Sequence, residues 1–67
     1  MSFDGLGAYI KERCQGIPDD QMPDIFTNSL GELYLSDWDC LLSAEKLNSF
    51  GFVFETSSGY YKYVKEN

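Results

Sequence analysis

The strongest constraint on the fold of this chain is a pair of aromatic, β-prone runs near its C-terminal end. The runs are "FVFE" (52–55) and "YYKYV" (60–64), and the polar segment "TSSG" (56–59) separates them. Phe, Tyr and Val on both sides of a Ser/Gly segment predict a β-hairpin. We therefore expect the chain to end in two antiparallel strands over residues 52–65.

The length of the hairpin loop decides which aromatic side chains share a face, because successive strand residues point to opposite faces. A loop of two or four residues places Phe52 and Phe54 on the same face as Tyr61 and Tyr63, which predicts one aromatic face packed on the helices. A three-residue loop with Gly59 in the left-handed conformation places the two tyrosines on the opposite face from the two phenylalanines. The sequence leaves both alternatives open.

Helical patterns precede the hairpin. Apolar residues recur at spacings of three and four between Phe3 and Cys14, which predicts an amphipathic helix over residues 3–14. Similar spacings predict a short second helix over about 22–29, with a loop as the alternative.

The segment "GELYLS" (31–36) predicts a short strand, because its leucines alternate with polar or aromatic residues. Ser36 is then expected to cap a third helix that runs to about Asn48. The two apolar stripes of that segment are also compatible with a break at Ser43, where a second cap would begin "AEKLNS".

These patterns predict a single small α+β domain over residues 1–67, in the order α-α-β-α-β-β. Its expected sheet is antiparallel and three-stranded, with the C-terminal hairpin packed on the helices. A chain of 67 residues is long enough for one domain, and its hydrophobic content of 43% favours a folded chain over a disordered one.

Charge distribution is the strongest functional lead. The formal net charge is −6, and residues 14–45 contain seven carboxylates and no Lys or Arg. Such a field attracts basic partners and repels nucleic acid and anionic membranes. The simpler interpretation is that these charges keep a small protein soluble. We expect an acidic partner-binding face made of Asp19, Asp20, Asp24, Asp37 and Asp39.

The main functional hypothesis is an acidic, non-enzymatic interaction or inhibitor domain that covers a basic surface of a partner protein, such as a nucleic-acid-processing enzyme. By composition the chain is similar to nuclease-toxin immunity proteins and to phage-encoded inhibitors of host nucleic-acid machinery, some of which mimic DNA. This similarity implies a phage or mobile-element protein. The expected aromatic anchors are Tyr34, Trp38, Tyr61 and Tyr63.

The alternative hypothesis is a nucleic-acid-binding module that uses the C-terminal hairpin. Tyr60, Tyr61 and Tyr63 alternate with Lys62 and Lys65, as in stacking platforms for single strands. The helix-then-hairpin order also resembles the tail of a winged-helix domain. Two lysines are few for phosphate binding and the helix would be acidic, so the sequence favours no nucleic-acid partner. A homo-oligomer that buries a spare aromatic face is a third hypothesis.

No catalytic, metal or cofactor constellation is recognisable. The chain has no His, no phosphate-binding loop and no metal-ligand spacing, so we expect neither enzymatic activity nor a cofactor. No secretory signal or membrane-spanning pattern is recognisable either, which predicts a cytoplasmic protein without a membrane partner. Cys14 and Cys40 are then expected to be two buried, reduced thiols, and the sequence does not indicate whether they lie close together.

Overall fold

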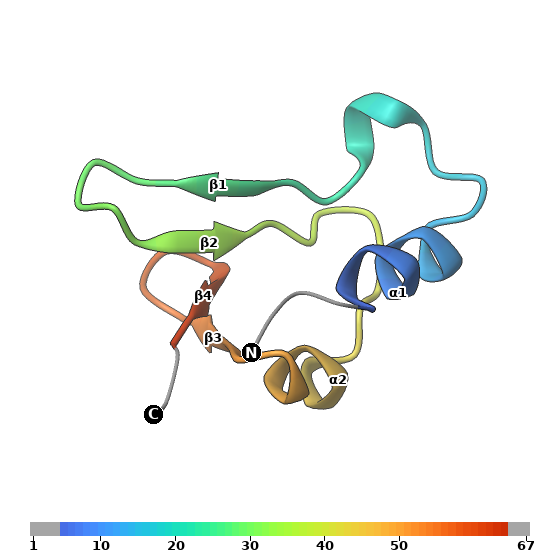
Figure 1. The fold of residues 1–67 in the computed structure, drawn as a ribbon. Helices are drawn as coiled ribbons and strands as arrows, with labels where there is room; N and C mark the ends of the chain where they lie inside the picture. Colours follow the sequence, from blue (N-terminus) through green and yellow to red (C-terminus); the bar gives the residue numbers. More distant parts are fainter. Residues whose placement is uncertain (1–4, 65–67) are drawn as a thin grey trace.

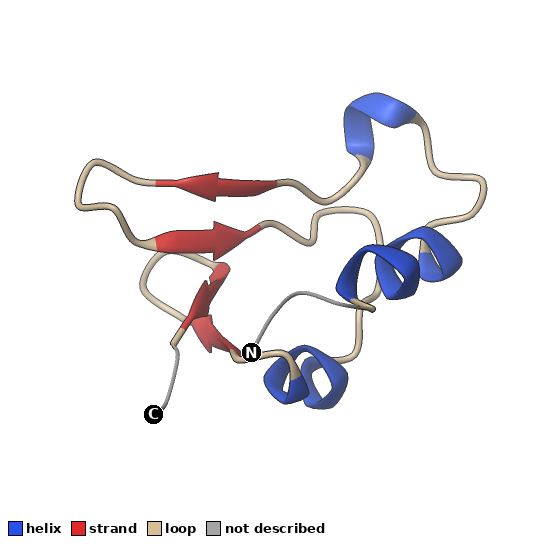
Figure 2. Cartoon of the chain, viewed as in Figure 1, coloured by secondary structure: helices blue, strands red, loops and turns tan. Residues whose placement is uncertain are grey.

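The computed structural model describes residues 5–64 and is built on a four-stranded antiparallel sheet with the strand order β1-β2-β4-β3 (Figure 1). The elements in chain order are α1 (Leu6–Arg13), the 3₁₀ helix η1 (Asp19–Gln21), β1 (Ile25–Thr27), β2 (Leu33–Leu35), α2 (Ala44–Ser49), β3 (Phe52–Glu55) and β4 (Tyr60–Tyr63). Strands and helices gather on different sides of the molecule (Figure 2). The structure is α+β, but the predicted three-stranded sheet and the predicted order α-α-β-α-β-β are wrong.

β1 is the strand that the sequence prediction missed, and it replaces the helix expected over 22–29. Pro23 disfavours a helical conformation in the residue before it. Met22 is accordingly extended, with φ −71° and ψ 148°. The β-branched residues Ile25 and Thr27 then favour a strand, which pairs with β2. The helical spacing of the apolar residues in this segment was therefore misleading.

α1 forms the central part of the predicted N-terminal helix, while Phe3 and the predicted helix start lie outside the described residues. Gly5 precedes the first helical residue with φ 87°, a conformation that glycine adopts without strain. Leu6 points into the core and is 1% exposed.

The predicted third helix is confined to α2, and its expected start at Ser36 is wrong. The backbone N–H of Ser36 donates to the carbonyl of Asp24 (3.0 Å), and its hydroxyl accepts from the Asp24 N–H (2.9 Å). Ser36 thus continues the contacts between β1 and β2. Ser43 caps α2 instead, because its Oγ accepts from the Lys46 N–H at 3.2 Å. Of the two alternatives, the structure forms the break at Ser43.

The hairpin of β3 and β4 has an even loop, residues 56–59. Phe52 therefore pairs with Tyr63, and Phe54 pairs with Tyr61. The ring centroids are 5.3 and 5.2 Å apart in these pairs. Of the two alternatives, the structure forms the shared aromatic face, but this face is not wholly packed on the helices, since Phe54 is 48% exposed.

The core lies between the helices and one face of the sheet. Its buried members are Leu6, Cys14, Leu35, Cys40, Leu42, Leu47 and Phe52. Leu35 and Phe52 come from the sheet, and Leu6 and Leu47 come from the two helices. Each large apolar side chain buried in this way contributes about 1.5–3 kcal/mol. The helices thus cover the sheet face that carries Leu35.

No helix among residues 5–64 has the length and apolar character needed to cross a bilayer.

Candidate functional site

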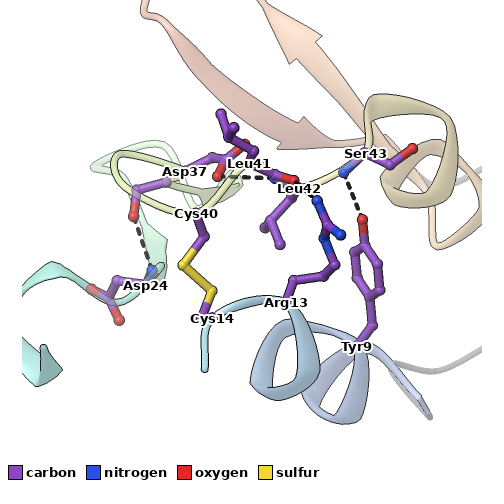
Figure 3. Close-up of a disulfide and its surroundings, with 10 residues drawn as sticks. Tyr9, Arg13, Cys14, Asp24, Asp37, Cys40, Leu41, Leu42 and Ser43 are labelled. Atoms are coloured by element: carbon purple, nitrogen blue, oxygen red, sulfur yellow. Dashed lines mark hydrogen bonds between the residues drawn. A yellow bond between two sulfur atoms is a disulfide. The ribbon is translucent and has the colours of Figure 1, made fainter. Parts of the chain in front are cut away.

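A disulfide joins Cys14, at the end of α1, to Cys40, in the loop between β2 and α2 (Figure 3). The two Cα atoms are 5.5 Å apart. Both side chains are buried, as predicted, but the expectation that they are reduced thiols is wrong. The two cysteines meet because the loop folds back across the end of α1, a tertiary contact that the sequence spacing did not indicate.

Two side chains of α1 hold the same loop, residues 37–43, at positions that follow Cys40. The Arg13 guanidinium donates to the Leu41 carbonyl at 2.9 Å. The Tyr9 hydroxyl accepts from the Ser43 N–H at 2.6 Å (Figure 3). One covalent bond and two hydrogen bonds therefore fix the loop to the helix.

Asp37 closes the start of this loop. Its Oδ1 accepts from the Leu42 N–H at 3.5 Å. Partial burial raises the pKa of Asp37 above its usual value, and the hydrogen bond from Leu42 opposes that shift. The carboxylate is thus held within the loop.

The loop displays two large apolar side chains to solvent. Trp38 is 71% exposed and Leu41 is 84% exposed. Their neighbours Cys40 and Leu42 are buried in the core. A single exposed apolar side chain is ordinary on a protein surface, whereas tryptophan is usually highly buried. Display of Trp38 from a loop that is fixed to a helix is typical of a binding surface.

Aspartates occur in two segments at the end of the sheet from which this loop leaves. Because β1 and β2 are antiparallel, the start of β1 and the end of β2 lie at the same end of the sheet (Figure 1). The segment leading into β1 carries Asp19, Asp20 and Asp24, all exposed, and the segment leaving β2 carries Asp37 and Asp39. We call these five aspartates the acidic end. The segments that carry the five predicted aspartates thus lie at the same end of the sheet, and Trp38 and Leu41 belong to the loop that leaves it.

A second feature lies on the sheet face opposite the core. Neighbouring strand residues face opposite sides, so Tyr34 faces away from the Leu35 side. The Tyr34 ring stacks on Phe26 with centroids 5.8 Å apart. The Tyr60 ring packs edge-on against Phe26 at 5.3 Å, and Trp38 packs edge-on against Tyr60 at 5.8 Å. We call Phe26, Tyr34, Trp38 and Tyr60 the aromatic patch.

An open pocket of about 220 Å³ lies at one end of the aromatic patch. It is lined by Phe26, Asn28, Tyr34, Ser58 and Tyr60. Asn28 begins the turn between β1 and β2, and its Oδ1 accepts from the backbone N–H groups of Leu30 and Glu32, at 3.0 and 2.9 Å. The turn between β1 and β2 therefore supplies part of the pocket wall.

Glu32 and Lys62 form an ion pair on this face. The Lys62 Nζ lies 2.7 Å from the Glu32 Oε2, and the Asn28 Nδ2 donates to the Glu32 Oε1 at 3.0 Å. The hydrogen bond from Lys62, followed by that from Asn28, lowers the pKa of Glu32, and the same pair raises the pKa of Lys62. Lys62 is thus engaged by a carboxylate, and Lys65 lies outside the described residues.

The predicted aromatic anchors differ in their exposure. Trp38 is exposed, whereas Tyr34 is only 7% exposed beneath its ring neighbours. Tyr61 and Tyr63 are half-buried on the core side, and burial is the main cause that raises the pKa of Tyr61. Tyr61 and Tyr63 thus contribute mainly to packing.

Two members of the aromatic patch, Phe26 and Tyr60, were absent from the predicted anchors. Phe26 was assigned to a helix. The sequence did contain a signal for Tyr60. Because neighbouring residues of one strand face opposite sides, the pair Tyr60–Tyr61 must place one tyrosine on the face opposite the core.

Among residues 5–64, no three Cys, Asp or Glu side chains are arranged so that they could hold a metal ion. Comparison of the chain with protein-family models, curated proteins and solved structures finds no match. The functional argument therefore depends on the geometry described above.

Proposed function

We propose that this protein is a non-enzymatic binding domain that docks on a basic surface of a partner protein through its acidic end. The observation that carries the proposal is the display of Trp38, 71% exposed, from a loop fixed to α1 and flanked by aspartates. Aspartates provide long-range attraction to a basic surface and accelerate association, while a tryptophan buried on binding supplies much of the affinity.

Fixing the loop favours tight binding. A loop that is already held in its bound conformation loses little conformational entropy when the partner arrives. The disulfide and the Arg13 and Tyr9 hydrogen bonds supply this fixation. Leu41, three positions after Trp38 in the same loop, is a second exposed apolar side chain that a partner could cover.

The disulfide also bears on where the protein acts. Disulfides form and persist mainly in oxidising compartments, such as the periplasm or the extracellular space. We therefore propose an oxidising compartment in place of the cytoplasmic one that the sequence suggested. Intracellular nucleic-acid machinery would not be present in such a compartment. The proposal therefore names only a basic protein surface as the partner.

Capture of the partner from the source cells tests this function. The protein is immobilised as wild type, as Trp38→Ala and as Leu30→Ala, and captured proteins are identified by mass spectrometry. Leu30 is the matched control because it is 79% exposed but lies in the turn between β1 and β2. We expect a basic protein that is retained by wild type and Leu30→Ala and lost from Trp38→Ala.

Binding kinetics of the purified partner then test the role of the aspartates. Asp39→Asn is expected to slow association, whereas Glu12→Gln, on the exposed surface of α1, has a smaller effect. Association of the wild type is expected to slow steeply as salt is raised. Salt-independent association, or equal binding by Trp38→Ala, would contradict the proposal.

A further inference from the structure

We propose that the aromatic patch is a docking site for an extended, proline-containing segment whose flanking Arg or Lys lies at the acidic end. This inference rests on the proposed function, because it names the chemistry that the basic partner would present to the same side of the molecule. It assigns a role to Phe26, Tyr60 and the pocket between the two hairpin loops. These features have no part in the binding by the acidic end proposed above.

The shape of the patch is the first argument. Three of its rings form a row with perpendicular neighbours, since Trp38 is at 89° to Tyr60 and Tyr60 is at 82° to Phe26. The fourth ring, Tyr34, stacks on Phe26 at 17°. Perpendicular neighbours produce a ridged surface, and the pocket of about 220 Å³ is a hollow beside the packed rings, with Asn28 and Ser58 also in its wall. Proline rings fit hollows of this kind, and the polyproline II conformation is already extended before binding, so that little entropy is lost.

The polar groups near the pocket are the second argument. A polyproline II segment has no internal hydrogen bonds, so its carbonyl groups are free to accept them. Ser58 and Tyr60 line the pocket and carry hydroxyl groups, which can donate to such carbonyls, whereas the Tyr34 hydroxyl is engaged by Glu32. The pocket thus combines apolar walls with donors.

The distribution of charge is the third argument, and it gives the site a direction. Trp38 lies between Asp37 and Asp39 in the chain, so this end of the row is acidic. At the pocket end, the charge of Glu32 is matched by Lys62 at 2.7 Å. A basic residue of the ligand therefore gains most at the Trp38 end, and the prolines extend from there to the pocket.

A cage for a methylated ammonium group is the other ligand class that aromatic rings bind. The centroids of Phe26, Tyr34 and Tyr60 are 5.3 to 6.4 Å apart, so these rings contact each other and leave no space between them for a cation. A ligand that lies across the rings fits this packing better.

Fluorescence titration with synthetic peptides tests the site, because Trp38 is the only tryptophan of the chain. The probes are an octaproline with two arginines at its N-terminus and one with two arginines at its C-terminus. Their controls replace all prolines by alanine, or both arginines by glutamate; trimethyllysine is a further probe. We expect one arginine–proline peptide to bind at least about tenfold more tightly than both of its controls.

Two matched substitutions locate the binding by NMR titration. Phe26→Leu removes a ring of the patch but keeps an apolar side chain, and we expect it to weaken binding of the arginine–proline peptide about tenfold or more. Phe54→Leu makes the same change on the opposite face, where Phe54 packs against Tyr61, and is expected to bind like wild type. Amide spectra of both variants establish that they remain folded.

The inference is overturned if neither arginine–proline peptide binds below about 1 mM, if the alanine peptides bind equally well, or if trimethyllysine alone binds. It also fails if Phe26→Leu and Phe54→Leu have the same effect. Partner capture that depends on Trp38 and Asp39 without peptide binding would remove only this inference. Peptide binding without Trp38-dependent capture would instead remove the proposed function.

Discussion

At the scale of single residues, local contacts shift the pKa values of two carboxyl groups in opposite directions. Glu32 receives hydrogen bonds from Lys62 and Asn28, which favour its charged form and lower its pKa. Asp37 is partly buried at the start of the loop 37–43, and this burial disfavours its charged form and raises its pKa. Glu32 therefore stabilises the fold when ionised, while ionisation of Asp37 opposes folding.

The pH dependence of Glu32 follows from the direction of its shift. A carboxyl with a lowered pKa in the folded state adds stability above its unfolded pKa, near 4.5, and loses it as the pH falls through the folded value. Lys62→Met is expected to return the pKa of Glu32 towards 4.5 and to remove this contribution. A carbon-detected NMR titration of the carboxyl measures the shift. Lys11→Met, on the exposed surface of α1, is the control, and an unchanged Glu32 titration in Lys62→Met would contradict the assignment.

At the scale of elements, the junction between α2 and β3 depends on Gly51. This residue has φ 101°, and a Cβ atom there would lie 2.5 Å from Cε1 of the Tyr63 ring. Gly51→Ala is expected to reduce the free energy of unfolding by about 2 kcal/mol, since it adds backbone strain and displaces Tyr63. Urea denaturation measures the change.

Gly7→Ala is the matched control for that substitution. Gly7 lies in α1, and a Cβ added there would have no atom from outside the helix backbone within 4 Å. Alanine is the better helix former, so Gly7→Ala is expected to raise the free energy of unfolding by up to about 1 kcal/mol. Equal effects of the two substitutions would show that the Gly51 conformation does not constrain the junction.

Elements whose signals are local could be predicted from the sequence. The alternation around Tyr34 and the two aromatic runs of the hairpin depend on neighbouring residues alone, and β2, β3 and β4 form there. β1 was missed because its apolar spacing is compatible with a helix, and only pairing with β2 decides between the two. Ser36 likewise met the pattern of a helix cap, but its capping groups bond to Asp24 across the sheet.

At the scale of the whole molecule, the disulfide supplies a large share of a small stability margin. Cys14 and Cys40 are 26 positions apart, and closing a loop of that size adds about 3.5 kcal/mol by the chain-entropy estimate. A 67-residue domain has a thin margin of stability without such a link. Replacing both cysteines by serine, or reducing the bond, is expected to lower the free energy of unfolding by about this amount.

Denaturation of the oxidised and reduced protein measures that loss. The chain contains no other cysteine, so a change on reduction comes from this bond alone. Equal midpoints in the two states would contradict the expected contribution. The acidic end could be predicted in composition but not in arrangement, because the antiparallel pairing of β1 and β2 brings its two segments to the same end of the sheet.

The disulfide also changes the covalent connectivity of the molecule. Residues 14–40 form a closed ring, and the turn between β1 and β2 is part of it. A protease that cut beside the exposed Leu30 would open this ring without separating the chain into two pieces. Both cut ends would remain attached to the same core, and the two halves would part only after the sulfur–sulfur bond was broken. A molecule nicked in this way would therefore keep Trp38 and its aspartates linked to α1.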